Sequence, residues 1–211
     1  MRLGVFGGTF DPPHLGHVRV AEDARKHLKL DRVILVPAHV SPFKIEERGI
    51  TDREIRLSLV KAAVEGRRGL GVDRLELDRD PPSYTVATLR ALRVRMPEAE
   101  LFLLIGADQW SSFGRWKNVA EIARMATVVV MARDGHDPAD VDPGLPEGVE
   151  VPWRRVDVRR VDVSSTEVRE RVREGASIDD LVPSEVARLI DEHKLYRAAP
   201  RAQDAPAART A

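Results

Sequence analysis

Two histidines that follow a pair of glycines are the residues of this sequence best suited to act on phosphate groups. Gly7-Gly8 stand at the start of a turn, and His14 and His17 come at its end. Adjacent glycines let a backbone approach a ligand closely, and histidines three residues apart lie on one face of a helical turn. The N–H groups and partial positive charge of a helix N-terminus also favour phosphate. The stretch therefore predicts a phosphate-binding turn in which each imidazole donates an N–H.

The same stretch admits two other interpretations. In the first, His14 and His17 are surface or capping residues, and in the second they form a metal site with Asp11. Pro12 and Pro13 make the geometry of such a metal site awkward. The glycines do not follow the Gly-x-Gly-x-x-Gly pattern, and no Gly-Lys dipeptide occurs, which excludes the dinucleotide fingerprint and the P-loop.

The elements that must position this turn follow from the hydropathy pattern. Short apolar runs alternate with amphipathic stretches of helix length, which indicates βαβ units. We expect a doubly wound, Rossmann-like α/β fold with a mostly parallel sheet and a small C-terminal helical extension. Ligands bind such a sheet at the carboxyl ends of its strands, where Gly7-Gly8 would lie. Strands are expected at residues 2–6, 32–36, 71–77, 100–105, 127–131 and 150–163, and helices at 14–28, 51–65, 83–96, 109–113, 119–124, 164–174 and 183–193.

Several residues mark where these helices begin and end. Thr51 and Ser164 each open a capping-box pattern, and Ser83 offers a third N-cap. Gly175 stands where a C′ glycine belongs, and Pro183 suits the first position of the last helix.

The composition excludes several classes of protein. Of 211 residues 43% are hydrophobic, and 34 Lys plus Arg balance 34 Asp plus Glu, so no overall basic field attracts nucleic acid or an anionic membrane. The sequence has no cysteine, no apolar run near the ~20 residues that span a bilayer and no export signal. We expect a soluble, cytoplasmic protein with one domain over residues 1–197, whose helical C-terminal part is 164–197, and a disordered tail over 198–211.

Two motifs carry a resemblance to a known superfamily. Residues 7–17 resemble the Gly-Gly-x-Phe-Asp-Pro-x-His-x-Gly-His signature of the nucleotidyltransferases, and residues 164–169 resemble their Ser-Ser-Thr-x-x-Arg motif. Within that superfamily, residues 1–197 resemble the bacterial nicotinate-nucleotide adenylyltransferases. The resemblance implies transfer of the adenylyl group of ATP to nicotinate mononucleotide, which gives deamido-NAD and pyrophosphate in NAD biosynthesis.

The resemblance also implies which residues hold ATP. It assigns His17 to the α-phosphate in the transition state and His14 to the ATP phosphates, with Lys44 and Arg169 as further catalytic residues. Mg²⁺ is expected to be bound through the ATP phosphates, and no metal site made of protein ligands is expected. The residues implied to bind ATP are Gly7, Gly8, Thr9, Phe10, His14, His17, Gly106, Asp108, Ser164, Ser165, Thr166 and Arg169.

The acceptor side is implied at a different set of residues. A pyridinium ring is flat and cationic and stacks well on an aromatic face. Trp116 is the first choice for this platform, and Trp110 is an alternative or a neighbour, while core packing is the other interpretation of each. The residues implied to bind nicotinate mononucleotide are Thr85, Asp108, Trp110, Trp116, Lys44 and Arg133.

Two rival functions remain open at this stage. The same transfer to nicotinamide mononucleotide or to phosphopantetheine is one of them. A domain that senses nucleotides without turnover is the other, and the intact His14, His17 and Arg169 argue against it. The sequence also leaves open whether the chain forms a homo-oligomer.

Overall fold

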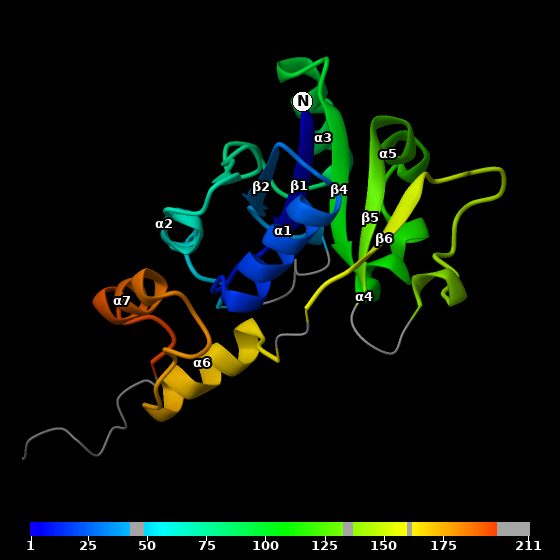
Figure 1. Ribbon diagram of the computed structural model, residues 1–211. Coiled ribbons are helices and arrows are strands. Elements are labelled where there is room, and N and C mark those ends of the chain that lie inside the picture. The colour runs from blue at the N-terminus through cyan, green and yellow to red at the C-terminus, as the bar shows by residue number, and fades with distance from the viewer. Residues whose placement is uncertain (43–48, 133–136, 160–161, 198–211) are drawn as a thin grey trace, which may run out of the picture.

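The computed structural model describes residues 1–42, 49–132, 137–159 and 162–197. Within these residues a six-stranded parallel sheet forms the centre of the molecule, with the strand order β3-β2-β1-β4-β5-β6 (Figure 1). The doubly wound α/β fold is therefore confirmed. The strands are β1 (Arg2–Gly8), β2 (Arg32–Pro37), β3 (Leu70–Val72), β4 (Glu100–Gly106), β5 (Ala126–Ala132) and β6 (Trp153–Asp157).

The strand order reverses between β1 and β4, and this point sets the location of the site. Gly8 pairs with Pro37 of β2, and on the other side of β1 Phe6 pairs with Leu104 of β4. Chains leaving β1 and β4 diverge to opposite faces of the sheet, which opens a crevice at their carboxyl ends. The turn that follows Gly7-Gly8 begins at this crevice.

Helices cover both faces of the sheet (Figure 1). Val18, Ala21 and Ala24 of α1 recur every three residues and are each 0% exposed, so one stripe of that helix faces the core. The helices on this face are α1 (Leu15–His27), α2 (Arg53–Val64), α6 (Ser165–Glu174) and α7 (Ser184–Glu192). The helices on the other face are α3 (Thr85–Arg95), α4 (Ala107–Trp110) and α5 (Val119–Met125). Two 3-10 helices, η2 (Phe113–Arg115) and η3 (Pro138–Asp140), lie in connections.

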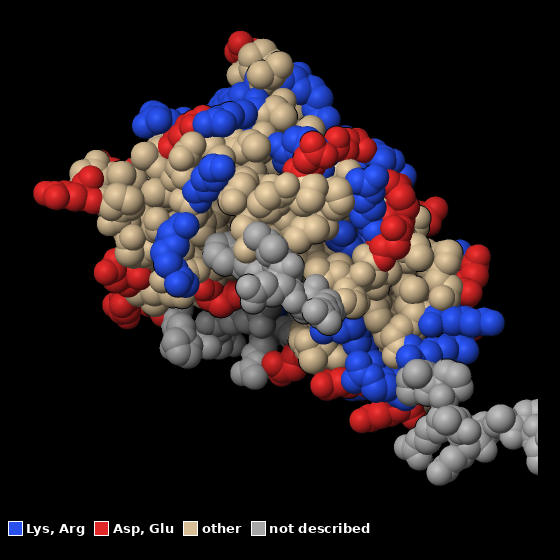
Figure 2. Space-filling model, turned by 180° about the vertical axis from the view of Figure 1, so that it is seen from behind, with Lys and Arg blue, Asp and Glu red and all other residues tan. Residues whose placement is uncertain are grey.

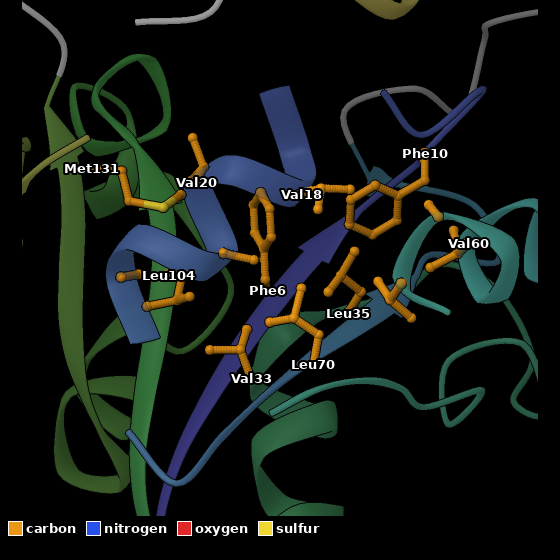
Figure 3. Close-up of a cluster of buried hydrophobic side chains, with 14 of the residues drawn as sticks. Phe6, Phe10, Val18, Val20, Val33, Leu35, Val60, Leu70, Leu104 and Met131 are labelled. Carbon is orange, nitrogen blue, oxygen red and sulfur yellow. The ribbon is translucent and has the colours of Figure 1, made fainter. Parts of the chain in front are cut away.

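Alternation along β1 divides the core into two clusters. Leu3 and Val5 face the α3 side, whereas Phe6 faces the α1 side and packs with Leu35 and Leu104 (Figure 3). Each fully buried side chain of this size contributes about 1.5–3 kcal/mol to folding. The cluster on the α1 side extends into α7, so the C-terminal helices share a core with the N-terminal ones.

The expected strand over residues 71–77 is wrong beyond Val72, where β3 ends. The Asp73 side chain accepts the backbone N–H of Leu75 at 3.1 Å, which turns the chain. Leu77 is buried inside the following turns, so its apolar character reflects the core and not a strand. Likewise β6 occupies only Trp153–Asp157 of the strand expected over 150–163, of which residues 160–161 lie outside the described part of the chain.

The helix boundaries confirm some of the expected caps and correct others. Ser164 caps α6 by accepting the Glu167 N–H at 3.1 Å, and Gly175 ends that helix with φ 72°, both as predicted. The cap of α2 is Asp52, not Thr51. The cap of α3 is Tyr84 and not Ser83, whose hydroxyl instead accepts the His39 N–H at 2.9 Å. Pro183 is the N-cap residue of α7 and not its first helical residue, which is Ser184.

Charges of both signs are interspersed on the face shown in Figure 2, as the balanced composition leads one to expect. Among the described residues, no helix combines the length and the apolar character needed to cross a membrane.

Candidate active site

The two histidines lie against each other at the N-terminus of α1. His14 is the N-cap residue, and its ring centroid lies 3.7 Å from that of His17. The His14 backbone N–H donates to Nδ1 of His17 at 3.2 Å. Because Nδ1 is the acceptor of this bond, the proton of a neutral His17 ring resides on Nε2. His17 is therefore a hydrogen-bond donor through Nε2 in both its neutral and its charged form.

Aromatic packing fixes His17 from the side of the core. Phe10 meets the His17 ring edge-on at 5.0 Å between centroids, and Phe6 meets Phe10 at 5.6 Å (Figure 3). A Cβ on Gly8 would lie 3.0 Å from the Phe10 ring, so a larger residue there would displace this packing. A Cβ on Gly7 would meet no atom within 4 Å, since it would point into open space.

The second motif meets the turn directly, although it lies about 150 residues further along the chain. The Ser165 hydroxyl donates to the Pro12 carbonyl at 2.8 Å. The Arg169 guanidinium donates to the Asp11 carbonyl at 2.7 Å through Nη1 and to the Thr166 hydroxyl at 3.2 Å through Nη2. The start of α6 is thus bound to the residues that precede His14.

A cavity of about 620 Å³ lies where these two segments converge. We call it the phosphate cavity. It is lined by most of the residues that the sequence predicted for ATP, namely Gly7, Gly8, Phe10, His14, His17, Gly106, Asp108, Ser164 and Ser165. Thr166 and Arg169 are not among its lining residues in the described part of the chain, because Arg169 is turned toward Asp11.

A second cavity of about 600 Å³ shares the wall formed by Gly7, Gly8, Asp108 and Gln109. We call it the aromatic cavity. Trp116 lines it and rests on Phe113 at 5.1 Å between ring centroids.

Other residues of the aromatic cavity supply its polar groups. Thr85, predicted for the acceptor, lines this cavity, and so does Thr9, predicted for ATP. Lys117 also lines it, with its ammonium 4.2 Å from the centroid of the Tyr84 ring. This distance is that of a cation–π contact.

Trp110 lies in the core and lines neither cavity among the described residues. Its ring is 2% exposed and stacks on Phe113, and its Nε1–H donates to the Pro138 carbonyl at 3.2 Å. The structure therefore gives Trp110 the packing role that was the alternative interpretation, supporting the layer on which Trp116 rests.

The Asp11 carboxylate, which the alternative metal interpretation groups with His14 and His17, has other partners in the structure. The Asp11 carboxylate accepts the Tyr196 hydroxyl at 2.6 Å and the Thr51 N–H at 3.1 Å, so it is engaged away from the histidines. No group of three or more His, Cys, Asp or Glu side chains suited to a metal occurs in residues 1–42, 49–132, 137–159 and 162–197. The predicted residues Lys44 and Arg133 and the predicted tail lie outside these ranges.

Arg56 is a residue of the site that sequence reasoning missed. Its side chain is 1% exposed, and it donates to carbonyl groups of Thr9 at 2.9 Å and Ala38 at 2.7 Å. Further bonds reach the carbonyls of His39 and Thr51. Burial lowers the pKa of this guanidinium, and the charge of Asp11 opposes the change. The sequence feature that could have identified it is the position of this arginine among the apolar residues of α2.

A buried carboxyl group in the aromatic cavity was also missed. Glu76 is 6% exposed and accepts the Thr88 hydroxyl at 2.5 Å, and Arg79 donates to that hydroxyl at 2.6 Å. Burial raises the pKa of the Glu76 carboxyl above its usual value. Its position in a segment that resembled a strand concealed it.

A parallel sheet with a histidine-bearing turn at its switch point and a Ser-Ser-Thr helix start beside it defines a class of α/β nucleotidyltransferases. In agreement, the family model described as Cytidylyltransferase-like matches residues 5–171.

Similar proteins narrow the class further. A Gemmatimonas aurantiaca protein named "Probable nicotinate-nucleotide adenylyltransferase" is 42% identical over 204 residues, which cover 95% of each chain. A Thermus thermophilus protein of the same name is 41% identical over 198 residues, covering 93% of this chain and 100% of its own. The chain belongs to the nicotinate-nucleotide adenylyltransferase family.

A solved structure shares the fold. Plasmodium falciparum nicotinic acid mononucleotide adenylyltransferase complexed with NaAD matches with a TM-score of 0.73 and 14% identity, covering 92% of this chain and 97% of that one. At this identity the likeness supports the architecture alone.

Proposed function

We propose that this chain transfers the adenylyl group of ATP to the phosphate of nicotinate mononucleotide, giving deamido-NAD and pyrophosphate. The observation that carries the proposal is the pair of cavities that share the wall of Gly7, Gly8, Asp108 and Gln109. One cavity presents histidines and hydroxyls suited to phosphates, and the other presents an aromatic face suited to a pyridine ring. The two reacting phosphates would meet at the shared wall.

The reaction needs alignment more than it needs a base. A phosphate monoester is largely dianionic at neutral pH because its second pKa is about 6. One of its oxygens attacks the α-phosphorus of ATP, and the bond from that phosphorus to the bridging oxygen breaks as pyrophosphate leaves. Negative charge is spread over the phosphoryl oxygens in the transition state. Fixed donors that neutralise this charge lower the barrier by a few kcal/mol each.

His17 supplies such a donor in this proposal. Its Nε2–H points away from the bond that Nδ1 accepts from His14, and we assign it to the α-phosphate. His14 and Ser165, which line the same cavity, take the remaining ATP phosphates. Arg169 does not line this cavity among the described residues, and its assignment to the β- and γ-phosphates rests on the family resemblance. Its bonds to Asp11 and Thr166 use two of the five N–H donors of the guanidinium.

The remaining assignments concern the acceptor and the metal ion. Trp116 is the proposed platform for the pyridine ring, with Thr85 and Asp108 beside it. Lys44 and Arg133 stay proposals that rest on the family resemblance alone. Mg²⁺ enters as part of the MgATP substrate, in keeping with its preference for phosphate oxygens and water. A cytoplasmic location likewise stays a prediction from the sequence.

The choice of acceptor rests on charge as well as on the names of the relatives. Arg115 and Lys117 line the aromatic cavity together with Asp108 and Glu76, and burial raises the pKa of Glu76, which favours its neutral form. The remaining excess of positive charge favours the anionic nicotinate over its neutral amide.

Initial rates with three acceptors test this function. The purified chain is mixed with ATP and Mg²⁺ and with nicotinate mononucleotide, nicotinamide mononucleotide or phosphopantetheine, and pyrophosphate release is followed. We expect kcat/KM to be at least about tenfold higher for nicotinate mononucleotide, since a charge difference in a partly desolvated site is worth about 1.4 kcal/mol or more. A preference for another acceptor, or nucleotide binding without pyrophosphate release, contradicts the proposal. A reaction without acceptor serves as the blank.

A further inference from the structure

The carboxylate of Asp11 is buried beside the two histidines but is directed away from both substrates' cavities. Asp11 is 7% exposed, and it lines neither cavity among the described residues. Its Oδ1 accepts the hydroxyl of Tyr196 at 2.6 Å, and its Oδ2 accepts the N–H of Thr51 at 3.1 Å. A carboxylate engaged in this way can fix the backbone of its own turn but has no path to a reacting phosphate.

The rest of that turn is held by residues from distant parts of the chain. Arg56 binds the Thr9 carbonyl. Arg169 donates to the Asp11 carbonyl, and Ser165 donates to the Pro12 carbonyl. The N–H of Leu15, at the start of α1, donates to the Leu181 carbonyl at 2.9 Å.

The backbone is in the left-handed region at Tyr196 and at Phe10, the residue before Asp11, and surrounding contacts must stabilise it at both positions. Phe10, which precedes Asp11, has φ 51°, and Tyr196 has φ 60°. The left-handed region is unfavourable for residues other than glycine and persists where surrounding contacts hold it. Phe10 is also the ring that packs on His17, so a relaxed turn would move His17 directly.

We propose that Tyr196 is a positioning residue of the nucleotide site, which acts through the Asp11 carboxylate to hold the turn that orients His14 and His17. The inference rests on the proposed function for its kinetic consequences. Tyr196 lines neither cavity among the described residues, so we assign it an indirect role and no contact with the substrates. The hydroxyl remains a donor at physiological pH because burial and the charge of Asp11 raise its pKa well above the usual value.

The variant Tyr196→Phe removes the hydroxyl and keeps the ring. We expect kcat of adenylyl transfer to fall by about tenfold or more, because small displacements of catalytic groups cost one to two orders of magnitude. The KM values for ATP and nicotinate mononucleotide should stay within about threefold, since the histidines act mainly on charge that develops in the transition state.

A matched control is Glu22→Gln. Glu22 lies on α1 and pairs with Arg67 at 2.9 Å, so the variant also weakens a polar tertiary contact of that helix by removing its charge. It is expected to leave kcat within twofold of the unchanged chain. An equal loss of kcat in the two variants, or a kcat within twofold in Tyr196→Phe, overturns the proposal.

A double-mutant cycle tests whether Tyr196 acts through Asp11. Tyr196→Phe should cost at least about threefold less in kcat in an Asp11→Asn background than in the unchanged chain, because residues that act together are not additive. Equal costs in the two backgrounds contradict the proposed route. The cycle also remains informative if one single variant is less stable, provided that thermal melting shows each variant folded at the assay temperature.

Imidazole nuclear magnetic resonance signals give a readout that does not depend on turnover. In protein without nucleotide, Tyr196→Phe should shift the ring signals of His14 and His17, whereas Glu22→Gln should leave them in place. Unchanged signals in Tyr196→Phe overturn the positioning role. If the unchanged chain lacks adenylyl transfer, the proposed function fails, and these signals still decide the inference.

Discussion

The two cavities of the site are fixed by different kinds of interaction. The turn at the phosphate cavity is held by hydrogen bonds from Arg56, Ser165, Arg169 and Tyr196, which come from three separate places in the chain, since Ser165 and Arg169 both lie on α6. The aromatic cavity instead lies on short helices and connections that pack through rings and close backbone contacts.

The packing beneath Trp116 shows the second kind of support. Trp110, Phe113 and Trp153 form an aromatic layer with centroids 5.3–5.6 Å apart. The N–H of Gly114 donates to the Pro143 carbonyl at 2.7 Å, and a Cβ on Gly114 would lie 1.7 Å from the carbonyl oxygen of Gly144. Only glycine allows this approach of two backbones.

The difference follows from what each cavity must hold. Developing negative charge is stabilised by donors that are already oriented, and hydrogen bonds give the required direction. A flat ring needs a surface of the correct shape, and packing provides it without fixed donors. Variants on the phosphate side should therefore lower kcat, and variants on the aromatic side should raise KM for the acceptor.

The largest expected effect is that of His17→Ala. Loss of the Nε2–H donor should lower kcat by about 10²-fold or more with little change in ATP affinity, because the donor acts on transition-state charge. Steady-state kinetics together with calorimetric ATP binding measure the two quantities. An equal loss of ATP affinity and of kcat would identify His17 as a ground-state contact.

A smaller effect is expected for Trp116→Ala. Removal of the stacking platform should raise KM for nicotinate mononucleotide about tenfold, since such a contact is worth about 1–2 kcal/mol, while KM for ATP changes little. Trp153→Phe serves for comparison, because that ring belongs to the supporting layer on β6 and keeps an aromatic side chain, so KM for the acceptor should rise less than in Trp116→Ala. A raised KM for ATP in Trp116→Ala would show that the division between the two cavities is wrong.

The smallest effect is expected for Glu76→Gln and appears in stability. Burial raises the pKa of Glu76 in the folded chain above the unfolded value of 4.5. The unfolded state therefore releases the proton first as pH rises, and the unchanged chain loses stability from about pH 4.5 upward. Relative to the unchanged chain, Glu76→Gln should be more stable at pH 8 than at pH 4 in urea unfolding. A difference that does not vary with pH would show that the carboxyl is ionised as readily in the folded chain.

The sequence alone predicted those parts of the fold and site that depend on neighbouring residues. The strand, glycine pair and histidines of β1 and α1 are contiguous, and the cap of α6 is set by Ser164 and its neighbours. The resemblance then brought these two segments together, and the structure shows their contact through Ser165.

The parts that escaped prediction depend on long-range contacts. Tyr196 and Asp11 are 185 positions apart, and nothing in the types of these residues indicates that they pair. The sequence pattern places Leu77 in a strand because it is apolar, but its apolar side chain is required by burial in the core and not by strand formation. Trp110 and Trp116 are residues of the same type in the segment that follows β4, and only the packing shows that Trp110 lies in the core and Trp116 in the cavity wall.

The bond between Tyr196 and Asp11 has a consequence for synthesis of the protein. The turn that bears the histidines is synthesised before the hydroxyl that secures it, which is added 185 residues later. If Tyr196 positions the turn as proposed, a nascent chain that lacks this residue would transfer adenylyl groups at least about tenfold more slowly. A premature stop codon shortly before Tyr196 would leave His14, His17, Ser165 and Arg169 encoded and, under the same proposal, still yield a poorer catalyst.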